Sequence, residues 1–249
     1  MSLQRLIVSP EQVMGDQLRL TPEQQHYLYR VLRLTTGARF LALDGSGDQW
    51  MAELTSPGTA TVSARPRLAQ AVTAPTITLV MALPKGNGFD AVVRQATELG
   101  VTTLQPVITE RTLSAPNLKK LDRWQRIAAE ATEQCERLRL PQILPPLPWS
   151  TYLQPPPTGR RWLCVARHRV PHLLTVAQRG DPGAPIVLAI GPEGGWTEAE
   201  LVAAQQAGFR LVTLGPHILR AVTAPLAALA IVTAATAVLA PPSHSSSSE

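Results

Sequence analysis

Two glycine-rich stretches in the last quarter of the chain could bind a ligand through their backbone. The first reads GPEGG over residues 191–195 and keeps one carboxylate, Glu193. The second reads LGPHILR over residues 214–220 and keeps His217 and Arg220. Glycine allows a ligand to approach the backbone closely, and peptide groups can then pair with the edge of a flat ring such as adenine. The alternative is that these glycines only form tight turns.

The two stretches do not match the phosphate-binding patterns of common nucleotide enzymes. Neither fits GxGxxG or GxxxxGK[ST], so a dinucleotide or triphosphate cradle is not supported. Cys135 and Cys164 are the only cysteines, and the sequence has no CxxC motif or Cys/His cluster. We therefore expect no metal site and no disulfide framework.

Apolar runs alternate with helical patterns through the last two thirds of the chain, and each glycine-rich stretch follows such a run. This alternation predicts a parallel sheet with helices on both faces, and ligands bind such sheets beyond the carboxyl ends of the strands. Strands are expected over 76–83, 103–109, 161–166, 185–190 and 209–214. Helices are expected over 89–100, 117–140 and 197–206, with an apolar helix within 221–240.

The first 72 residues favour a small β-rich domain with one helix. Thr21, Pro22 and Gln24 form a capping-box pattern, after which Tyr27, Leu28, Val31 and Leu32 recur at helical spacing as a buried stripe. A hairpin is predicted over 38–54 around the turn DGSGD, with a further strand over 60–68. We expect domains at 1–72 and 73–241 and a flexible tail at 242–249.

Charge and hydropathy leave room for an anionic partner. The chain has 23 basic and 18 acidic residues, a net charge of +5, although a solvated basic surface would explain this equally well. The uncharged run 221–240 consists mainly of Ala and Thr and contains Pro225, so we expect a buried or interface helix rather than a membrane span. No secretion signal is recognisable, which favours the cytoplasm.

Five segments in order give the sequence a family resemblance. They are 25–47, 83–112, 123–143, IGPEGGWTEAE at 190–200 and LGPHILRAVTA at 214–224. Together they resemble the ribosomal RNA small subunit methyltransferase E family of the SPOUT superfamily. The resemblance implies a C-terminal α/β domain with a deep trefoil knot and a mostly parallel sheet, preceded by a PUA-like β-barrel that binds RNA. It also implies methylation of N3 of a uridine in the decoding region of 16S rRNA, in the small ribosomal subunit.

The resemblance further implies that the two stretches hold S-adenosylmethionine. Apolar side chains would pack on the adenine and backbone groups would pair with its edge. The implied contacts are Leu188, Ala189, Gly191, Gly194 and Gly195 on one side, and Leu214, Gly215, Ile218, Leu219 and Arg220 on the other. Two chains would pair through the knotted domain into a homodimer.

Arg220 and Glu193 are the expected catalytic residues. Arg220 could stabilise negative charge on the uracil oxygens as N3 loses its proton, or it could form a surface ion pair. Glu193 could accept that proton, bind the amino group of the cofactor, or cap the following helix. Many relatives have glutamate where Val222 stands, so the identity of the general base stays open.

Substrate RNA would contact the N-terminal domain. The candidates are Arg5, His26, Arg30 and Arg33, which could equally form an ordinary polar face. A second set near the first strands of the knotted domain could be an ion-pair network or a substrate rim: Lys85, Arg94, Glu98, Glu110 and Arg111. The alternatives to the main interpretation are a SPOUT ribose 2′-O-methyltransferase acting on tRNA or rRNA, and a catalytically silent RNA-binding protein.

Overall fold

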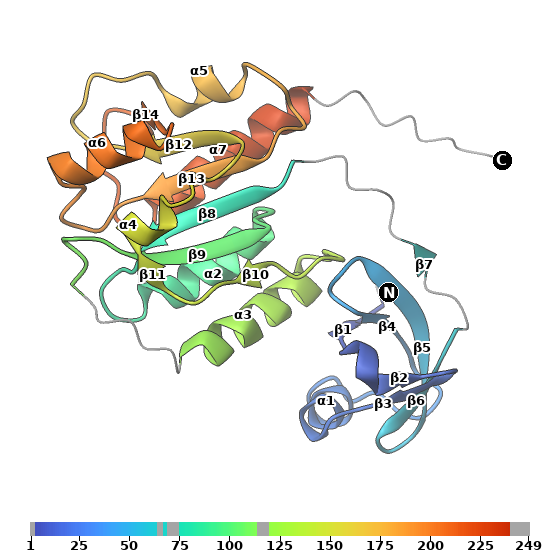
Figure 1. The fold of residues 1–249 in the computed structure, drawn as a ribbon. Coiled ribbons are helices and arrows are strands. Elements are labelled where there is room, and N and C mark those ends of the chain that lie inside the picture. Colours follow the sequence, from blue (N-terminus) through green and yellow to red (C-terminus); the bar gives the residue numbers. More distant parts are fainter. Residues whose placement is uncertain (1–2, 64–66, 69–74, 114–119, 240–249) are drawn as a thin grey trace. The chain divides into compact units, whose positions relative to one another are not determined.

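The computed structural model describes residues 3–63, 67–68, 75–113 and 120–239 (Figure 1). The chain divides into two compact units, one of residues 1–72 with 129–140 and the other of residues 73–128 with 141–249. The segment 129–140 therefore groups with the first unit, although the sequence suggested consecutive ranges. The expected tail, 242–249, lies outside the described residues.

A curled sheet forms the first unit. Within the described residues its order is β1-β4-β5-β6-β3-β2, with β7 beside β5. Among the strands that the structure describes in this unit, only β1 and β4 pair in parallel, and the predicted hairpin is confirmed as the antiparallel pair β4 and β5. The bounds are β1 Arg5–Ile7, β2 Val13–Met14, β3 Gln17–Arg19, β4 Arg39–Leu43, β5 Asp48–Ser56, β6 Thr59–Val62 and β7 Arg67–Leu68, with a short 3-10 helix, η1, at Pro10–Gln12.

The helix of the first unit begins as predicted but changes its winding. The Gln24 amide donates to Thr21 Oγ1 at 3.3 Å, and the Thr21 amide donates to Gln24 Oε1 at 2.8 Å, which confirms the capping box before α1 Pro22–His26. The chain then continues as a π-helix, η2 Tyr27–Val31. Leu28 is buried but Val31 is 57% exposed, so the predicted stripe is wrong at Val31. The wider π turn rotates this side chain off the face that 3.6-residue spacing predicts.

A parallel sheet forms the second unit, as the alternating pattern predicted. All of its strand pairs in the described residues are parallel, in the order β10-β9-β8-β13-β12-β14, with β11 beside β9. The bounds are β8 Ile77–Ala82, β9 Thr103–Ile108, β10 Gln142–Ile143, β11 Leu147–Pro148, β12 Arg160–Cys164, β13 Ile186–Ile190 and β14 Arg210–Val212.

Helices cover both faces of this sheet (Figure 1). On one face, α4 and α6 contribute Trp149 and Leu201 to a core that includes Leu163 and Val187 of the strands. On the other face, α7 packs against β13, α2 and α5. The bounds are α2 Gly88–Glu98, α4 Trp149–Tyr152, α5 Leu173–Ala177, α6 Glu198–Gln206 and α7 Ala224–Leu239. The sequence did not suggest β10, β11, α4 or α5, which are too short to show a clear period.

The long helix expected over 117–140 ends earlier in the structure, where α3 spans Leu121–Gln134, and residues 117–119 lie outside the described residues. Glu136 adopts a left-handed backbone with φ of 63°, and this conformation ends a helix. Beyond it, the Leu140 amide donates to the Gly45 carbonyl at 2.8 Å, so tertiary contacts of the first unit end the helix early.

The apolar C-terminal run forms α7, with Pro225 near its start, where proline is tolerated. Among the residues that the structure describes, no helix has the length and hydropathy needed to cross a membrane. The trefoil knot implied by the resemblance stays a prediction.

Candidate functional site

The carboxyl edge of the parallel sheet gathers the loops that the sequence singled out. Cys164, at the end of β12, lies opposite Ile190 of β13 and Val212 of β14. The three strands therefore end level with one another, and the loops that follow them start side by side. The two glycine-rich stretches share this edge as expected, but β12 lies between their strands, which the sequence did not indicate.

One part of the edge, which we call the latched side, consists of residues 83–87, 109–112 and 191–194. Glu193 Oε1 accepts the Lys85 amide at 3.0 Å. Arg111 Nη1 donates to the Gly194 carbonyl at 2.9 Å, and Glu200 Oε1 accepts the Glu110 amide at 2.9 Å. Lys85, Glu110 and Arg111 thus join the loops through backbone groups, and among the described residues they do not form the expected ion pairs with one another. Hydrogen bonds, rather than ion pairs, fix the loops after β8, β9 and β13 to each other.

Capping of α6 was one of the three roles expected for Glu193, and the capping box of this helix forms between other residues. Thr197 Oγ1 accepts the Glu200 amide at 3.4 Å, and Glu200 Oε2 accepts the Thr197 amide at 2.9 Å. This capping box satisfies the start of α6 without Glu193. Glu193 is exposed, and its Oε2 has no hydrogen-bond partner among the described residues. One carboxylate oxygen of Glu193 therefore links two loops, and the other is free to bind a ligand or a proton.

Gly191 and Gly194 are explained by packing within the protein. The Trp196 indole donates to the Cys164 carbonyl at 3.2 Å, and a Cβ on residue 191 would lie 2.9 Å from Trp196 Nε1. A Cβ on residue 194 would lie 3.3 Å from Arg111 Cβ and Cδ. The missing side chains at 191 and 194 therefore make room for Trp196 and Arg111. We call these two the packed glycines.

Gly195 and Gly215 face open space. Their φ values are 71° and 128°, a region that other L-residues rarely adopt. Apart from the two chain neighbours of each glycine, no described residue has a heavy atom within 4 Å of the position of an added Cβ. Nearby in the second stretch, Ile218 is 61% exposed. Two open-sided backbone segments and an exposed apolar side chain suit a flat, partly apolar ligand. We call Gly195 and Gly215 the open glycines.

The remaining predicted cofactor contacts divide by burial. Leu188 and Ala189 are fully buried in β13, where they pack in the core and have no surface to offer a ligand. Leu214 and Leu219 are half-buried in the second stretch. Arg220 is exposed, and its side chain has no ion pair or hydrogen bond among the residues that the structure describes. The Arg220 carbonyl accepts the amides of Thr223 and Ala224, which fixes the backbone of this residue just before α7.

Sequence reasoning missed two residues at this edge, Trp196 and Thr213, and it did not predict the packing of Val222. Trp196 ties the first stretch to β12. Thr213 Oγ1 accepts the Gly215 amide at 3.3 Å and donates to the Gly215 carbonyl at 3.1 Å, so it holds the second stretch. Val222 Cγ1 would lie 2.9 Å from a Cβ on Gly88, the first residue of α2. A tryptophan directly after GPEGG was the only available signal.

The thiol of Cys164 lies at the end of β12, in surroundings that disfavour its charged form. Burial raises the pKa of its thiol to about 12, so the thiolate is not populated at neutral pH. In the described part of the chain, no group of three or more His, Cys, Asp or Glu side chains could hold a metal ion.

The RNA candidates of the first unit fall into two groups. His26, Arg30 and Arg33 are exposed, and their side chains make no hydrogen bond or ion pair within the described residues. Arg5 is different, because its side chain is 16% exposed and its Nη2 lies 2.8 Å from Glu136 Oε2. Arg5 is therefore a structural ion-pair residue of this unit rather than a free cation.

A second carboxylate of the first unit has an unusual environment. Glu133 Oε1 accepts the Ile7 amide at 2.7 Å. Burial raises the pKa of Glu133 to about 7, against the lowering effect of this hydrogen bond, and the charge of Glu130 raises it further. Glu133 joins α3 to β1 and titrates near neutral pH.

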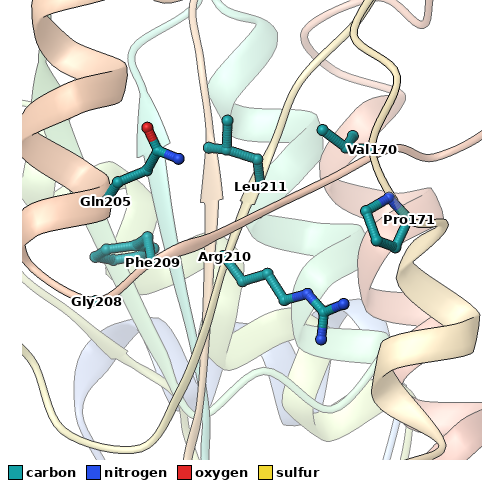
Figure 2. A pocket seen from close by; sticks show the side chains of 7 residues that line it. All are labelled: Val170, Pro171, Gln205, Gly208, Phe209, Arg210 and Leu211. Atoms are coloured by element: carbon teal, nitrogen blue, oxygen red, sulfur yellow. The ribbon is translucent and has the colours of Figure 1, made fainter.

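A hollow of about 510 Å³ lies beside the edge strand β14, and Figure 2 shows its side chains. None of the residues that the sequence predicted for the site lines it. Its lining consists of Val170, Pro171, Gln205, Gly208, Phe209, Arg210 and Leu211. The open glycines, rather than this hollow, carry the features expected of the site.

Comparison with known proteins relates both parts of the chain to RNA modification. Residues 72–233 match the RNA methyltransferase domain family, and residues 20–66 match the RNA methyltransferase PUA domain family. The chain is 46% identical to the ribosomal RNA small subunit methyltransferase E of Synechocystis over 92% of its own length and 77% of that protein. It is 27% identical to the Bacillus subtilis protein of the same name, over 88% of this chain and 91% of that one.

A solved structure gives the same picture. The ribosomal RNA small subunit methyltransferase E of Neisseria gonorrhoeae, bound to S-adenosyl methionine, superposes with a TM-score of 0.81 at 32% identity. The match covers 92% of this chain and 96% of the other.

Proposed function

This chain belongs to the ribosomal RNA small subunit methyltransferase E family, and from that premise we propose that it methylates N3 of a uridine in the decoding region of 16S rRNA. The protein is a methyltransferase that uses S-adenosylmethionine, as the family and its cofactor-bound relative indicate. The single observation that carries the proposal is the 46% identity to the ribosomal RNA small subunit methyltransferase E of Synechocystis over 92% of this chain.

The cofactor fits the open glycines better than the packed ones. Gly195 and Gly215 leave space beside their α-carbons, and Ile218, three residues after Gly215, offers an exposed apolar surface. We therefore assign the contacts to Gly195, Leu214, Gly215, Ile218 and Leu219. Gly191 and Gly194 act indirectly by admitting Trp196 and Arg111, which shape the loop. When bound, S-adenosylmethionine supplies a methyl group on a positively charged sulfur, which is already electrophilic.

Positioning is the main task left to the protein. Holding two reactants in register supplies about 7–11 kcal/mol in the best intramolecular reactions. Rigid loops serve this purpose, and the hydrogen bonds of the latched side and of Thr213 provide the rigidity. The protein thus orients the uracil ring toward the open glycines.

Arg220 is the proposed catalytic cation. The N3 proton of uracil must leave, and negative charge then develops on the neighbouring carbonyl oxygens. The exposed guanidinium of Arg220 has no partner among the described residues and is available to donate hydrogen bonds to such an oxygen. Glu193 is the proposed proton acceptor through Oε2, while Oε1 stays on the Lys85 amide. Val222, which stands where many relatives have glutamate, packs at Gly88 and cannot take a proton.

The RNA face, the dimer and the cellular location complete the proposal. His26, Arg30 and Arg33 would hold the RNA while the target base is flipped out of its stack, which costs a few kcal/mol. Two chains would pair through the second unit, so that the RNA-binding unit of one chain serves the site of the other. The apolar composition of α7 supports such pairing, and the molar mass in solution tests it. Ribosomal subunits as substrate imply the cytoplasm.

The test is incubation of the protein with labelled S-adenosylmethionine and small ribosomal subunits that lack the modification. Mass mapping of the digested RNA should find 3-methyluridine at one position in the decoding region. A methyl group on a ribose would support a 2′-O-methyltransferase instead. No transfer, together with no heat of cofactor binding, would indicate an RNA-binding protein without activity.

A further inference from the structure

The loop that follows β12 exposes three consecutive basic residues: Arg167, His168 and Arg169. We propose that this loop binds the phosphodiester backbone of the substrate RNA, with Arg167 and Arg169 as the contacting groups. The inference rests on the proposed function, because it assumes an RNA substrate at the carboxyl edge.

The position of the loop is fixed by the strands on both sides of it. The Val165 amide donates to the Val212 carbonyl at 2.9 Å, and the Cys164 carbonyl accepts the Trp196 indole at 3.2 Å. The loop therefore begins between the two glycine-rich stretches, level with Gly191. An RNA base presented to the open glycines would bring its flanking phosphates to this part of the edge.

Arginine side chains near the two ends of β12 differ in their hydrogen bonding. At the amino end, Arg161 Nη1 donates to the Pro157 carbonyl at 2.8 Å and to the Ala207 carbonyl at 2.7 Å. Arg160 also donates to several carbonyls there. At the carboxyl end, Arg167 and Arg169 have no side-chain hydrogen bond or ion pair within the described residues. Strand β12 thus carries structural arginines at its amino end, whereas the arginines of the loop after its carboxyl end have no side-chain partner among the described residues.

The backbone of Arg167 supports a functional reading of the loop. Its φ is 63°, a left-handed conformation that favours glycine or asparagine and costs free energy for other residues. The Val170 amide donates to the His168 carbonyl at 3.1 Å and closes the bend just after it. Such strain concentrates at functional sites, and asparagine would be easier to accommodate at this position than the long cation of Arg167.

Phosphate is the ligand that this arrangement suits. A guanidinium offers paired N–H donors to two oxygens of one phosphate, and the charge of each phosphodiester offsets an uncompensated cation. Phosphate contacts fix the register of a nucleic acid without reading its sequence. The loop would hold the strand so that Arg220, in the neighbouring stretch, meets the target base.

The experiment measures binding of a fluorescein-labelled RNA hairpin, copied from the decoding region of 16S rRNA, by anisotropy over a salt series. Arg167→Asn/Arg169→Gln removes both charges and tolerates the left-handed backbone at 167. The slope of log K against log salt is negative, and each lost phosphate contact reduces its magnitude by about 0.7–0.9. The magnitude should therefore decrease by about 1.5 in this variant. Affinity at low salt should fall roughly tenfold or more.

Two control variants accompany this pair. Arg167→Lys/Arg169→Lys keeps the charge and should keep most of the salt slope. Arg179→Gln removes one exposed charge beside the amino end of β12, where Arg160 Nη2 reaches the Arg179 carbonyl, and should change neither quantity. Calorimetry with S-adenosylmethionine should give the wild-type affinity for all three variants.

RNA affinity and salt slope unchanged in Arg167→Asn/Arg169→Gln would overturn the inference while leaving the proposed function intact. Weaker cofactor binding with unchanged RNA binding would also overturn it, since the arginines would then serve the cofactor. A wild-type protein that binds neither RNA nor S-adenosylmethionine would overturn the proposed function and this loop with it.

Discussion

The carboxyl edge of the parallel sheet has two sides that use the same residue type for different purposes. On the latched side, the packed glycines leave room for Trp196 and Arg111, and side chains hydrogen-bond to backbone groups of neighbouring loops. The other side, which we call the open side, consists of residues 166–169, 195 and 214–220. There the open glycines have no described residue other than their chain neighbours within 4 Å of an added Cβ. Arg167, Arg169 and Arg220 are exposed and have no side-chain partner within the described residues. The GPEGG motif therefore contains two glycines with a structural role, Gly191 and Gly194, and one that faces the proposed ligand, Gly195. Only the atoms that surround each α-carbon distinguish the two kinds.

The largest effect should come from filling the open side. Gly195→Trp places a large side chain where no atom now lies within 4 Å, so we expect cofactor affinity to fall at least 100-fold, measured by calorimetry (~2.7 kcal/mol). Gly100→Trp is the matched control, because Gly100 has a similar φ of 91° and equally open surroundings at the end of α2. Both variants lose stability through backbone strain, but only the first should lose the cofactor. Normal binding by Gly195→Trp would remove this loop from the site.

The next effect separates two arginines of the same edge. Arg220→Ala should lower kcat by about 100-fold, the usual size for losing one donor to a developing charge, with little change in melting temperature. Arg111→Ala removes the hydrogen bond to the Gly194 carbonyl and should cost about 1 kcal/mol of unfolding free energy, with kcat changed only a few-fold. Single-turnover rates and urea unfolding measure the two quantities. A larger loss of kcat in Arg111→Ala than in Arg220→Ala would contradict the assignment of Arg220 to catalysis and of Arg111 to structure.

A smaller effect tests the packing explanation of Gly191. Gly191→Ala forces a Cβ within 2.9 Å of Trp196 Nε1 and should destabilise the protein by about 1–3 kcal/mol. Trp196→Leu removes the clash, so the double variant should be less destabilised than the sum of the single changes by about 1 kcal/mol in urea unfolding. Strict additivity would mean that Gly191 has another role and that the latched side is not a packed unit.

The smallest expected effect is on the pH dependence of stability, which we attribute to Glu133 of the first unit rather than to the carboxyl edge of the parallel sheet. The pKa of Glu133 is about 7 in the folded protein, above its ordinary value of 4.5, because the buried carboxylate is poorly solvated. The folded state therefore binds a proton more tightly than the unfolded chain, and this contribution to stability is lost as pH rises from about 4.5 to about 7. Screening by solvent limits it to about 1–2 kcal/mol.

Glu133→Gln keeps an acceptor for the Ile7 amide and should flatten this part of the stability curve, followed by urea unfolding between pH 5 and pH 8. An unchanged curve would show that Glu133 is not the titrating group. Methyl-transfer rates of the same variant should keep their own pH dependence, because Glu133 belongs to the first unit and not to the edge.

Local patterns predicted much of the fold, and they failed where distant contacts decide. The capping box at Thr21, the hairpin around residues 44–48 and the alternation of strands and helices depend on neighbouring residues, and each is confirmed. Val31 was misplaced because the helix changes to π winding, and α3 ends early because Leu140 pairs with Gly45 of the first unit. Strand order was not predictable, since nothing near β12 in the sequence indicates that it lies between β13 and β14.

The candidate site shows the same division. The sequence located both glycine-rich stretches at the end of strands, which needs only the strand pattern. It could not show that Leu188 and Ala189 point into the core, or that Trp196 occupies the space beside Gly191. Those facts depend on elements that are far apart along the chain and meet only in the folded unit. The resemblance supplied the family, and the structure supplied the distinction between packed and open glycines.

A crystal structure of this protein soaked with S-adenosylmethionine tests the central claim most directly. The account predicts electron density for the ligand in contact with the α-carbons of Gly195 and Gly215 and with the side chain of Ile218. Density in the hollow beside β14, or a ligand packed against Gly191 with Trp196 displaced, would contradict it.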